Sequence, residues 1–442
     1  MNRFLRPSIF FAAALLLAGV FSSNQTAYAQ IQNGQLLISE FRFRGPDPDG
    51  AATNASGASD EFVEIYNNTD TALDIGGVAL VSLQSSGNGT TLLATVPTGT
   101  IIPARGHYLF TNSATSGGYS LSSYATRDQT YGTGISDNSG VALCRTSTLT
   151  NCTGGPGTST SNGTGADRID SVGFVQTGTT TQTARPFFIE GTALPLGPTA
   201  TITDAADQIS YVRRIAAGLP QDTNNNSDDF ILVSVTGNYT TGLNPSVDTA
   251  VTLGAPGPEN LSSPIVRNAT IKSRLLEPTL AATASPNRVR TGTGNSGTVS
   301  FRRTLRNSTG QTINSFRFRV NDLTTLNNDG GDTTRAILAL TDSIEFTYDP
   351  DDNPATANTQ VLGTTLEAPA TTNPGGGINA SLRVNLPSGV TVASGSSFSV
   401  NITFNIIRAG NYRFSLNHEA LLEATPTATP DADSFRKTAT SK

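Results

Sequence analysis

Two groups of side chains in this sequence have types and spacings that chemistry could use, and the first is a set of carboxylates. Glu40 and Glu64 fall in two short segments with strand character, LLISEFRFRG and EFVEIYNNTD, and Glu61 lies close to the second. Neighbouring carboxylates can act as general acid and base or hold a cation. Trp is absent, however, and aromatic residues make up only 7% of the chain, so a sugar-stacking cleft is not indicated. We therefore expect these carboxylates to bond to backbone groups or to an arginine such as Arg42.

The second group consists of loops rich in Asp and Asn, whose oxygens are the ligands that calcium prefers. Asp222, Asn224 and Asn226 have the 1, 3, 5 spacing of an EF-hand, and Asp228 follows them. The sixth position lacks the Gly and the twelfth the Glu that an EF-hand requires, so no EF-hand is predicted. Asx hydrogen bonds in an ordinary turn are the alternative that we favour over a structural calcium ion at these four residues. Three further loops have a similar composition: residues 47–50, 327–332 and 349–353.

Nucleophilic catalysis is not indicated by the histidines. The chain has two, His107 in RGHYLF and His418 in LNHEALLE, and neither lies near a GxSxG nucleophile elbow. A Ser–His–acid triad requires a histidine or an equivalent base beside the nucleophile. We expect both histidines to be packing or surface residues, and we predict that the protein is not an enzyme.

The cysteines are expected to form a disulfide. Cys144 and Cys152 are the only two and are separated by seven residues. In an oxidising compartment such a close pair indicates a disulfide that closes a hairpin. Metal binding by this pair alone is not expected, because the spacing is not CxxC and both histidines are distant in the sequence.

Arginines supply the last candidate binding site. Arg317 and Arg319 alternate with apolar residues on one predicted strand, and Arg302, Arg303 and Arg306 lie on the preceding one. If these strands pair, their arginines form a small basic face suited to acidic polysaccharide or phosphate. The alternative, which we favour, is a solvated face balanced by nearby acids.

The elements that must position these residues are predicted to be strands. In residues 265–423, apolar and polar residues alternate with a period of two in four segments: residues 315–320, 381–386, 399–406 and 411–416. Such alternation indicates an antiparallel sheet with one buried and one wet face. This second domain is therefore expected to be an immunoglobulin- or fibronectin-like β-sandwich. The remaining residues, 424–442, form a Thr/Pro/Ala-rich tail that is expected to be disordered.

The first domain, residues 30–260, also consists of short strands with turn residues between them, as in a sandwich with long loop insertions. Its opening motifs are a strand ending in Glu, an acidic strand EFVEIYN and a Leu-Asp-x-Gly turn. Their residues are Glu40, Glu61, Phe62, Val63, Glu64, Ile65, Tyr66, Asn67, Leu73, Asp74 and Gly76. Together these motifs resemble the lamin tail domain family of secreted bacterial type. The resemblance implies an immunoglobulin-like fold and a role in interaction or localisation beside other domains.

The N-terminus predicts the compartment. Two arginines precede an apolar run at residues 9–21, and a small-x-small cleavage pattern ends at residue 29. This is typical of a signal peptide, residues 1–29, since a spanning helix needs about 20 apolar residues. An uncleaved anchor is the alternative. The mature chain is then expected to have no membrane span and to be secreted or held in the cell envelope.

Composition limits the partners. Charged residues are 14% of the chain, Gly is abundant at 43 residues, and the net charge is −6. An acidic chain is not expected to bind nucleic acid, which requires a basic patch. The sequence thus predicts an all-β protein with two immunoglobulin-like β-sandwich domains in tandem after a signal peptide. It is expected to be an exported, non-enzymatic binding or structural module with a protein or polysaccharide partner at the cell surface. A secreted hydrolase, or a hydrolase accessory protein, with a carboxylate or calcium site is the alternative.

Overall fold

The computed structural model describes twelve stretches of the chain. They are residues 31–45, 57, 60–83, 90–112, 119–137, 139–153, 165–174, 188–195, 208–237, 251–351, 357–367 and 376–423. The predicted signal peptide, the C-terminal tail and the Asp-rich loop at 47–50 lie outside these described residues. All described stretches belong to one compact unit.

The predicted all-β fold is confirmed. Strands dominate the described residues, and three short helices accompany them: η1 (Ser120–Ser123), α2 (Leu149–Thr153) and α3 (Asn226–Asp229). This follows from a composition rich in Thr, Val and Ile on strands and in Gly and Asn at turns. Among the described residues, no helix has the length and apolar character needed to cross a membrane.

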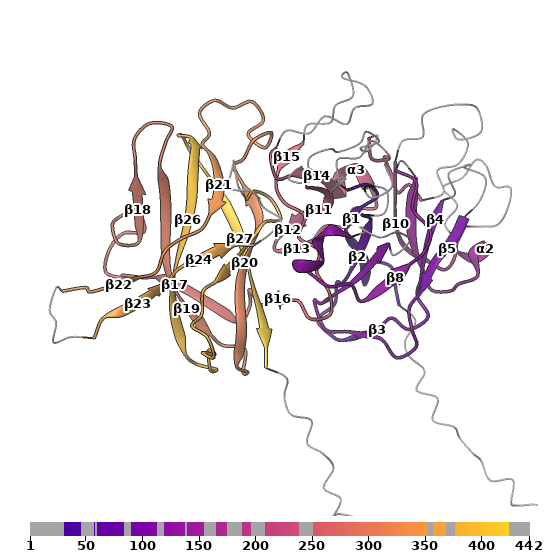
Figure 1. Cartoon of the computed structure of the whole chain (residues 1–442), viewed down its shortest axis with the longest axis horizontal. Helices are drawn as coiled ribbons and strands as arrows, with labels where there is room; N and C mark the ends of the chain where they lie inside the picture. The colour runs from indigo at the N-terminus through magenta and orange to yellow at the C-terminus, as the bar shows by residue number, and fades with distance from the viewer. Residues whose placement is uncertain are drawn as a thin grey trace, which may run out of the picture. The chain divides into compact units, whose positions relative to one another are not determined.

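The first half of the chain forms two main sheets (Figure 1). One has the strand order β15-β14-β11-β1-β2-β7-β8 and the other β10-β9-β4-β5, and β12–β13 and β3–β6 form small two-stranded sheets. The bounds are β1 Leu36–Arg42, β2 Phe62–Asn67, β3 Leu73–Asp74, β4 Ala79–Leu83, β5 Thr90–Thr95, β6 Ile101–Ile102, β7 His107–Asn112, β8 Gln129–Tyr131, β9 Gly140–Cys144, β10 Arg168–Gly173, β11 Ile209–Arg213, β12 Ile215–Ala216, β13 Leu219–Pro220, β14 Phe230–Ser234 and β15 Thr252–Leu253.

A hydrophobic core joins these two sheets. Phe41 and Ile65 from the larger sheet and Leu80 and Val172 from the smaller one belong to a single buried cluster. The opposite face of β2 is buried as well, because Phe62 packs in a separate cluster that includes η1. The sheet is therefore covered on both faces, and polar side chains on its outer face must find partners within the protein.

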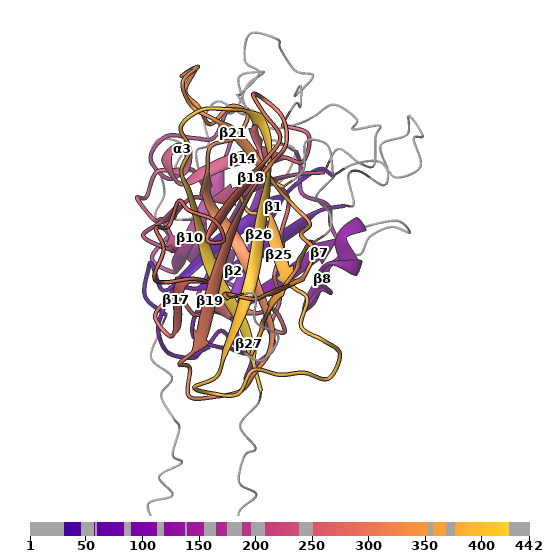
Figure 2. The same ribbon diagram turned by 90° about the vertical axis from the view of Figure 1, so that its left-hand side faces the viewer.

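The second half of the chain forms another pair of sheets, β16-β27-β20-β25-β24 and β17-β19-β26-β23-β22. Strands β18 and β21 pair with β19 and β26, respectively, and Figure 2 looks toward β17, β19 and β26. The bounds are β16 Ile265–Val266, β17 Ile271–Leu275, β18 Arg288–Thr291, β19 Thr298–Asn307, β20 Ile313–Leu323, β21 Ile337–Thr341, β22 Phe346–Tyr348, β23 Thr359–Leu362, β24 Thr364–Leu366, β25 Ser381–Val384, β26 Ser397–Arg408 and β27 Phe414–Leu422.

In this half the alternating apolar side chains are buried on the inner face, as expected, but the polar side chains are not all exposed to solvent. Phe316, Phe318, Leu382 and Phe404 are all buried in the second core cluster. Part of the polar face of the β20 sheet is buried, however, because the first half of the chain and the segment 255–260 cover it at Arg317 and Arg319. A period of two reveals which side chains share a face, but not what covers the polar one.

At Arg317 and Arg319 the expected balance by acids is present, but neither a basic face nor the solvated face that we favoured is found. Strands β19 and β20 lie in different sheets, so the arginines of the two strands are not neighbours on one surface. Arg317 and Arg319, moreover, are each only 6% exposed. Both make ion pairs within the protein, as described below, because the outer face of their sheet is covered.

The segment between the two halves is buried rather than exposed. Gly254 forms a parallel bridge with Ile378, and Ala255 donates its N–H to the Ile378 carbonyl oxygen at 3.0 Å. A Cβ at Gly254 would lie 2.5 Å from that oxygen, so the close approach requires glycine. Val233 and Ala255 belong to the second core cluster. Apolar packing and backbone pairing thus both connect the halves.

The predicted disulfide is present in the structure, where Cys144 and Cys152 are joined and fully buried. The prediction that it closes a hairpin is wrong. Cys144 ends β9 and Cys152 lies in the short helix α2. The bond therefore fixes a short helix against a strand end.

Candidate functional site

The candidate site is a group of charged side chains where the two halves meet, which we call the junction cluster. Strands β1, β2 and β7 present three of its members toward the polar face of β20 and β27, and the segment 255–260 passes between them. Its seven members are Glu40, Glu64, His107, Glu259, Arg317, Arg319 and Glu419. Each is at most 7% exposed.

Glu40 and Glu64 lie directly opposite each other on the antiparallel strands β1 and β2, as the sequence predicts. Backbone N–H groups of the intervening segment reach both: Gly257 donates to Glu40 Oε1 at 3.0 Å, and Glu259 donates to Glu64 Oε2 at 2.5 Å. Burial, together with the charge of Glu64, raises the pKa of Glu40 to about 7. The expectation of backbone partners holds, but the suggested partner Arg42 is wrong, because it pairs with Asp60.

The sequence of this segment suits its position. Pro256 and Pro258 have no N–H to satisfy, so the alternate residues Gly257 and Glu259 supply the donors that point at the carboxylates. Gly257 is required here, since a Cβ would lie 2.3 Å from Arg319 Nη1 and 3.0 Å from the Asn379 carbonyl oxygen. The proline-rich segment 255–260 is thus buried and connects the two halves through its backbone N–H groups.

His107 lies between two carboxylates. Its Nδ1 is 2.8 Å from Glu64 Oε1, and its Nε2 is 3.1 Å from Glu259 Oε2. Burial acts to lower the pKa of His107, but the charges of Glu259 and Glu64 outweigh it, and the pKa is raised above its ordinary value. An imidazolium with both ring N–H groups donating suits this geometry, because each nitrogen faces an acceptor.

The two arginines connect strands to the bridge. Arg317 Nε donates to Glu419 at 2.6 Å, and Arg319 Nε donates to the other oxygen of Glu419 at 2.9 Å. Both guanidinium groups also pair with Glu259, and Arg319 donates to the Gly257 carbonyl oxygen at 3.1 Å. These charge-assisted bonds compensate the desolvation of groups that would be costly to bury alone.

Charges within the junction cluster nearly cancel. Arg317, Arg319 and protonated His107 supply three positive charges, and Glu64, Glu259 and Glu419 supply three negative ones. Glu40 adds a fourth carboxyl, whose raised pKa favours the neutral form at and below about pH 7. Loss of any one of the charged members leaves an uncompensated buried charge, so single replacements at these positions are expected to be destabilising.

A metal site is the first chemical alternative. Single ligand atoms of Glu64, His107 and Glu259 all lie within 4.8 Å of one another, and imidazole with carboxylates is a donor set that transition metals accept. The same atoms already contact protein groups, however, and the guanidinium groups of Arg317 and Arg319 contact Glu259. The residues present suit a salt-bridge cluster better than a cation site, because a dication would be repelled by these guanidinium groups.

Of the predicted calcium candidates, Asn226 is buried, whereas Asn224 and Asp228 are exposed. The Oδ1 of Asn226 accepts from the N–H groups of Gly173 and Glu190, both at 3.1 Å, so that oxygen is used. Asp228 accepts from Asn225 at 2.8 Å, and Asn224 has a left-handed backbone with φ of 56°. The segment Asn226–Asp229 is the short helix α3, not an EF-hand loop.

Asp222 belongs to a different acidic group. Its carboxylate and those of Asp170 and Glu190 have oxygens within 4.8 Å of one another. Arg213 donates to Asp170 at 2.6 Å and lies 3.9 Å from Asp222. Burial, followed by the charge of Asp170, raises the pKa of Glu190 to about 8. Arg213 compensates part of the negative charge of this group, and Asn226 lies beside it, where its Oδ1 accepts from the Glu190 N–H.

Acid–base catalysis is the second chemical alternative. A coupled carboxyl pair such as Glu40 and Glu64 resembles the arrangement that gives one group a raised pKa. Substrate must reach such a pair, yet both are at most 3% exposed. Each already contacts protein donors: Glu40 accepts from Ser210 at 2.6 Å and Asn379 at 2.9 Å, and Ser39 donates to Glu64.

Sequence reasoning missed Glu259 and Glu419 and placed His107 outside any site. Glu419 lies directly opposite Arg317 in the antiparallel pairing of β20 and β27, strands about 100 residues apart. No local sequence pattern predicts that two strands so far apart in the chain will pair. The sequence did contain a signal for Glu259. This residue follows two alternating prolines, which lack N–H groups and favour an extended segment with few backbone donors.

Comparison with known proteins identifies part of the chain. Residues 29–176 match the family described as Lamin Tail Domain. That match includes the motif residues Glu40 to Gly76 and ends short of residue 260, the expected end of the first domain. No curated protein matches the chain. One solved structure, a DUF4876 family protein from Bacteroides thetaiotaomicron, has 15% identity and a TM-score of 0.29, covering 45% of this chain and 71% of that one.

Proposed function

We propose, from the premise that the N-terminal part of this chain is a lamin tail domain, that the protein is an exported binding or structural module. Its place is the cell envelope or the extracellular space. Its partner is a protein or a glycan of the cell surface, and it catalyses no reaction of its own.

The observation that carries this proposal is the burial of the charged residues and the contacts that they make within the protein. The carboxylates and the histidine best suited to acid–base chemistry are buried at the junction and contact protein donors or cations. These contacts favour a fixed arrangement of the two halves. A binding module needs such a rigid scaffold to present its recognition surface. Binding proteins of this kind place their recognition residues on loops carried by a rigid scaffold.

Export is supported by the N-terminal pattern of the sequence and by the Cys144–Cys152 disulfide. Disulfides persist in oxidising compartments and are rare in reducing ones. A test is to express the full chain with its own N-terminus and to determine the N-terminal residue of the exported product. Gln30 is expected as the first residue, and retention of residues 1–29 would contradict cleavage.

The binding proposal is tested with the purified protein on a glycan array and in a pull-down from isolated cell-surface material. Saturable binding of a glycan or surface protein, without turnover of esterase, phosphatase, nuclease or glycosidase substrates, is expected. The hydrolase alternative predicts turnover that Glu64→Gln abolishes while circular dichroism stays unchanged. Exposed Glu345 supplies the matched control, Glu345→Gln. Turnover lost in Glu64→Gln but kept in Glu345→Gln would overturn the proposal.

A further inference from the structure

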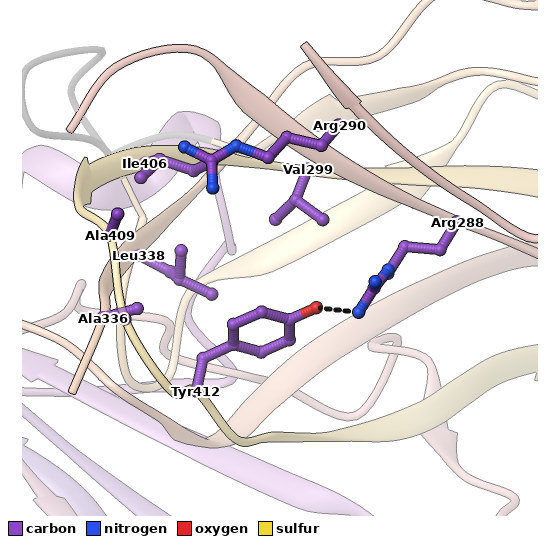
Figure 3. A pocket seen from close by; sticks show the side chains of 9 residues that line it. Arg288, Arg290, Val299, Ala336, Leu338, Ile406, Ala409 and Tyr412 are labelled. Atoms are coloured by element: carbon purple, nitrogen blue, oxygen red, sulfur yellow. Dashed lines mark hydrogen bonds between the residues drawn. The ribbon is translucent and has the colours of Figure 1, made fainter. Parts of the chain in front are cut away.

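The second half of the chain contains a small pocket at the open edge of its sandwich (Figure 3). Its walls come from β18, β19, β21 and β26 and from the turn at residues 409–412. The apolar lining consists of side chains that belong to, or pack against, the second core cluster: Val299, Ala336, Leu338, Ile406 and Ala409. The pocket is thus a continuation of the core toward solvent.

Strand register explains why apolar and cationic groups meet here. Arg290 of β18 lies opposite Val299 of β19, and Leu338 of β21 lies opposite Ile406 of β26. Side chains at paired positions project to the same face of a sheet. Arg288 and Arg290, two residues apart on the edge strand β18, therefore project to the face that carries the core.

Both arginines at the pocket bond to uncharged groups. Arg288 donates to the Tyr412 hydroxyl at 3.2 Å, and Arg290 donates to the Gly294 carbonyl oxygen at 2.5 Å. Among the described residues, neither arginine forms an ion pair, whereas Arg408 nearby pairs with Asp329. Figure 3 shows the Arg290 guanidinium extending toward Ile406 and that of Arg288 directed at Tyr412. Two guanidinium groups therefore flank an apolar cavity, and neither has an ion-pair partner in the part of the chain that the structure describes.

The size of the pocket limits its occupant. Its volume is about 120 Å³, which is close to the scale of dry apolar cavities, about 150 Å³, that accept a benzene ring. Apolar walls with a few convergent polar groups are typical of small-molecule sites. An arginine pair offers the planar donors that match a carboxylate.

We propose that this pocket binds a small organic carboxylate, with its apolar body, about the size of one aromatic ring, against Val299, Leu338 and Ile406 and its carboxylate at Arg288 and Arg290. The ligand is a free small molecule, so the site is distinct from the surface that recognises a protein or glycan partner. Tyr412 closes one side of the pocket and holds Arg288 in place through its hydroxyl group. Ala409 closes another side, where its N–H donates to Asn295 at 2.9 Å.

The test is a fluorine NMR titration of the purified protein with 4-fluorobenzoate, and with 4-fluorobenzyl alcohol as the neutral comparator. Saturable binding of the carboxylate is expected, with the alcohol weaker by about tenfold because it lacks the charge-assisted bonds. Arg290→Gln is expected to weaken the carboxylate by about tenfold and to leave the alcohol unchanged. Since Arg290 is exposed, this replacement is compatible with the fold.

Arg306→Gln is the matched control, because Arg306 is an exposed arginine on β19 outside the pocket. It is expected to leave carboxylate binding unchanged, and Ala409→Leu, which fills the cavity, is expected to abolish binding of both compounds. Absence of saturable carboxylate binding to the unmodified protein would overturn the proposal. Equal affinity for the alcohol, or equal losses in Arg290→Gln and Arg306→Gln, would overturn it as well.

Discussion

Glu40 and Glu64 face each other across strands β1 and β2 in a buried environment, and each accepts a backbone N–H from the segment that joins the two halves. Two carboxylates can be buried side by side here because neighbouring cations and a bound proton compensate their charge. Glu40 holds the proton. Burial and the charge of Glu64 raise its pKa to about 7. This pair therefore makes stability at the junction dependent on pH.

Replacing Glu40 with Gln tests this dependence. Folding raises the pKa of Glu40 from 4.5 to about 7, so the folded state binds the proton more tightly than the unfolded state. The resulting stabilisation is complete below pH 4.5 and is lost as pH rises through 7. Between pH 4 and pH 8, Glu40→Gln should therefore remove a decline of roughly 3 kcal/mol in the free energy of unfolding. Urea unfolding at both pH values measures it.

The control for this experiment is Glu345→Gln, at an exposed carboxyl. Its free energy of unfolding should follow that of the unmodified protein at both pH values. A decline between pH 4 and pH 8 that is the same in Glu40→Gln and in the unmodified protein would show that Glu40 does not carry the effect.

The two histidines should titrate far apart. The pKa of His107 is raised above 6.5 because its two carboxylate neighbours outweigh burial. Burial lowers the pKa of His418 to about 4. Each histidine thus serves as the internal reference for the other, and ring-nitrogen NMR against pH resolves both. At pH 6.5, both ring nitrogens of His107 are expected to be protonated and His418 neutral; a neutral His107 at that pH would contradict the geometry.

Arg213 provides a test of a buried pair away from the junction. Its side chain is fully buried, and it donates to Asp170 at 2.6 Å and to the Ile38 carbonyl oxygen at 2.6 Å. Arg213→Met leaves buried carboxylates without their cation and should cost about 3–5 kcal/mol of unfolding free energy. Arg413→Met, which removes an exposed pair with Asp322, should cost less than about 1 kcal/mol. Equal costs for the two variants would contradict this account.

The disulfide prediction concerns stability alone. Cys144 and Cys152 are eight residues apart in sequence, and closing so short a loop in the unfolded chain contributes about 2–3 kcal/mol in the chain-entropy model. The double replacement Cys144→Ser with Cys152→Ser should lower the free energy of unfolding by that amount. Adding a reductant should lower stability in the unmodified protein and have no effect on the double variant; an effect of reductant on both would contradict the assignment.

Much of the fold could be predicted from local patterns. Alternation at Phe316 and Phe318 identifies core positions because a strand has only two faces, and the pairing of Glu40 with Glu64 follows from adjacent strands. The burial of Arg317 and Arg319 could not be predicted from alternation. Alternation places them on a polar face, but whether that face meets water depends on a contact with residues far away in the sequence.

The junction as a whole depends on such distant contacts. Glu259 reaches arginines 58 or more residues further along the chain, and Asn379 donates to Glu40 across 339 residues. No spacing rule relates these positions, because packing of completed sheets brings them together. The same applies to the calcium candidates, where Asn226 turns its amide toward the backbone of Gly173 and Glu190.

The most direct test of the account is calorimetric unfolding of Arg319→Gln beside the unmodified protein. Arg319 bonds to Glu419 on β27, to Gly257 of the joining segment and to Asn379 just before β25, so its loss leaves buried carboxylates uncompensated where the halves meet. We predict one cooperative transition for the unmodified protein and for exposed Arg383→Gln, and two separate transitions for Arg319→Gln. Two transitions in the unmodified protein, or a single unchanged one in Arg319→Gln, would contradict the claim that the junction cluster holds the halves together.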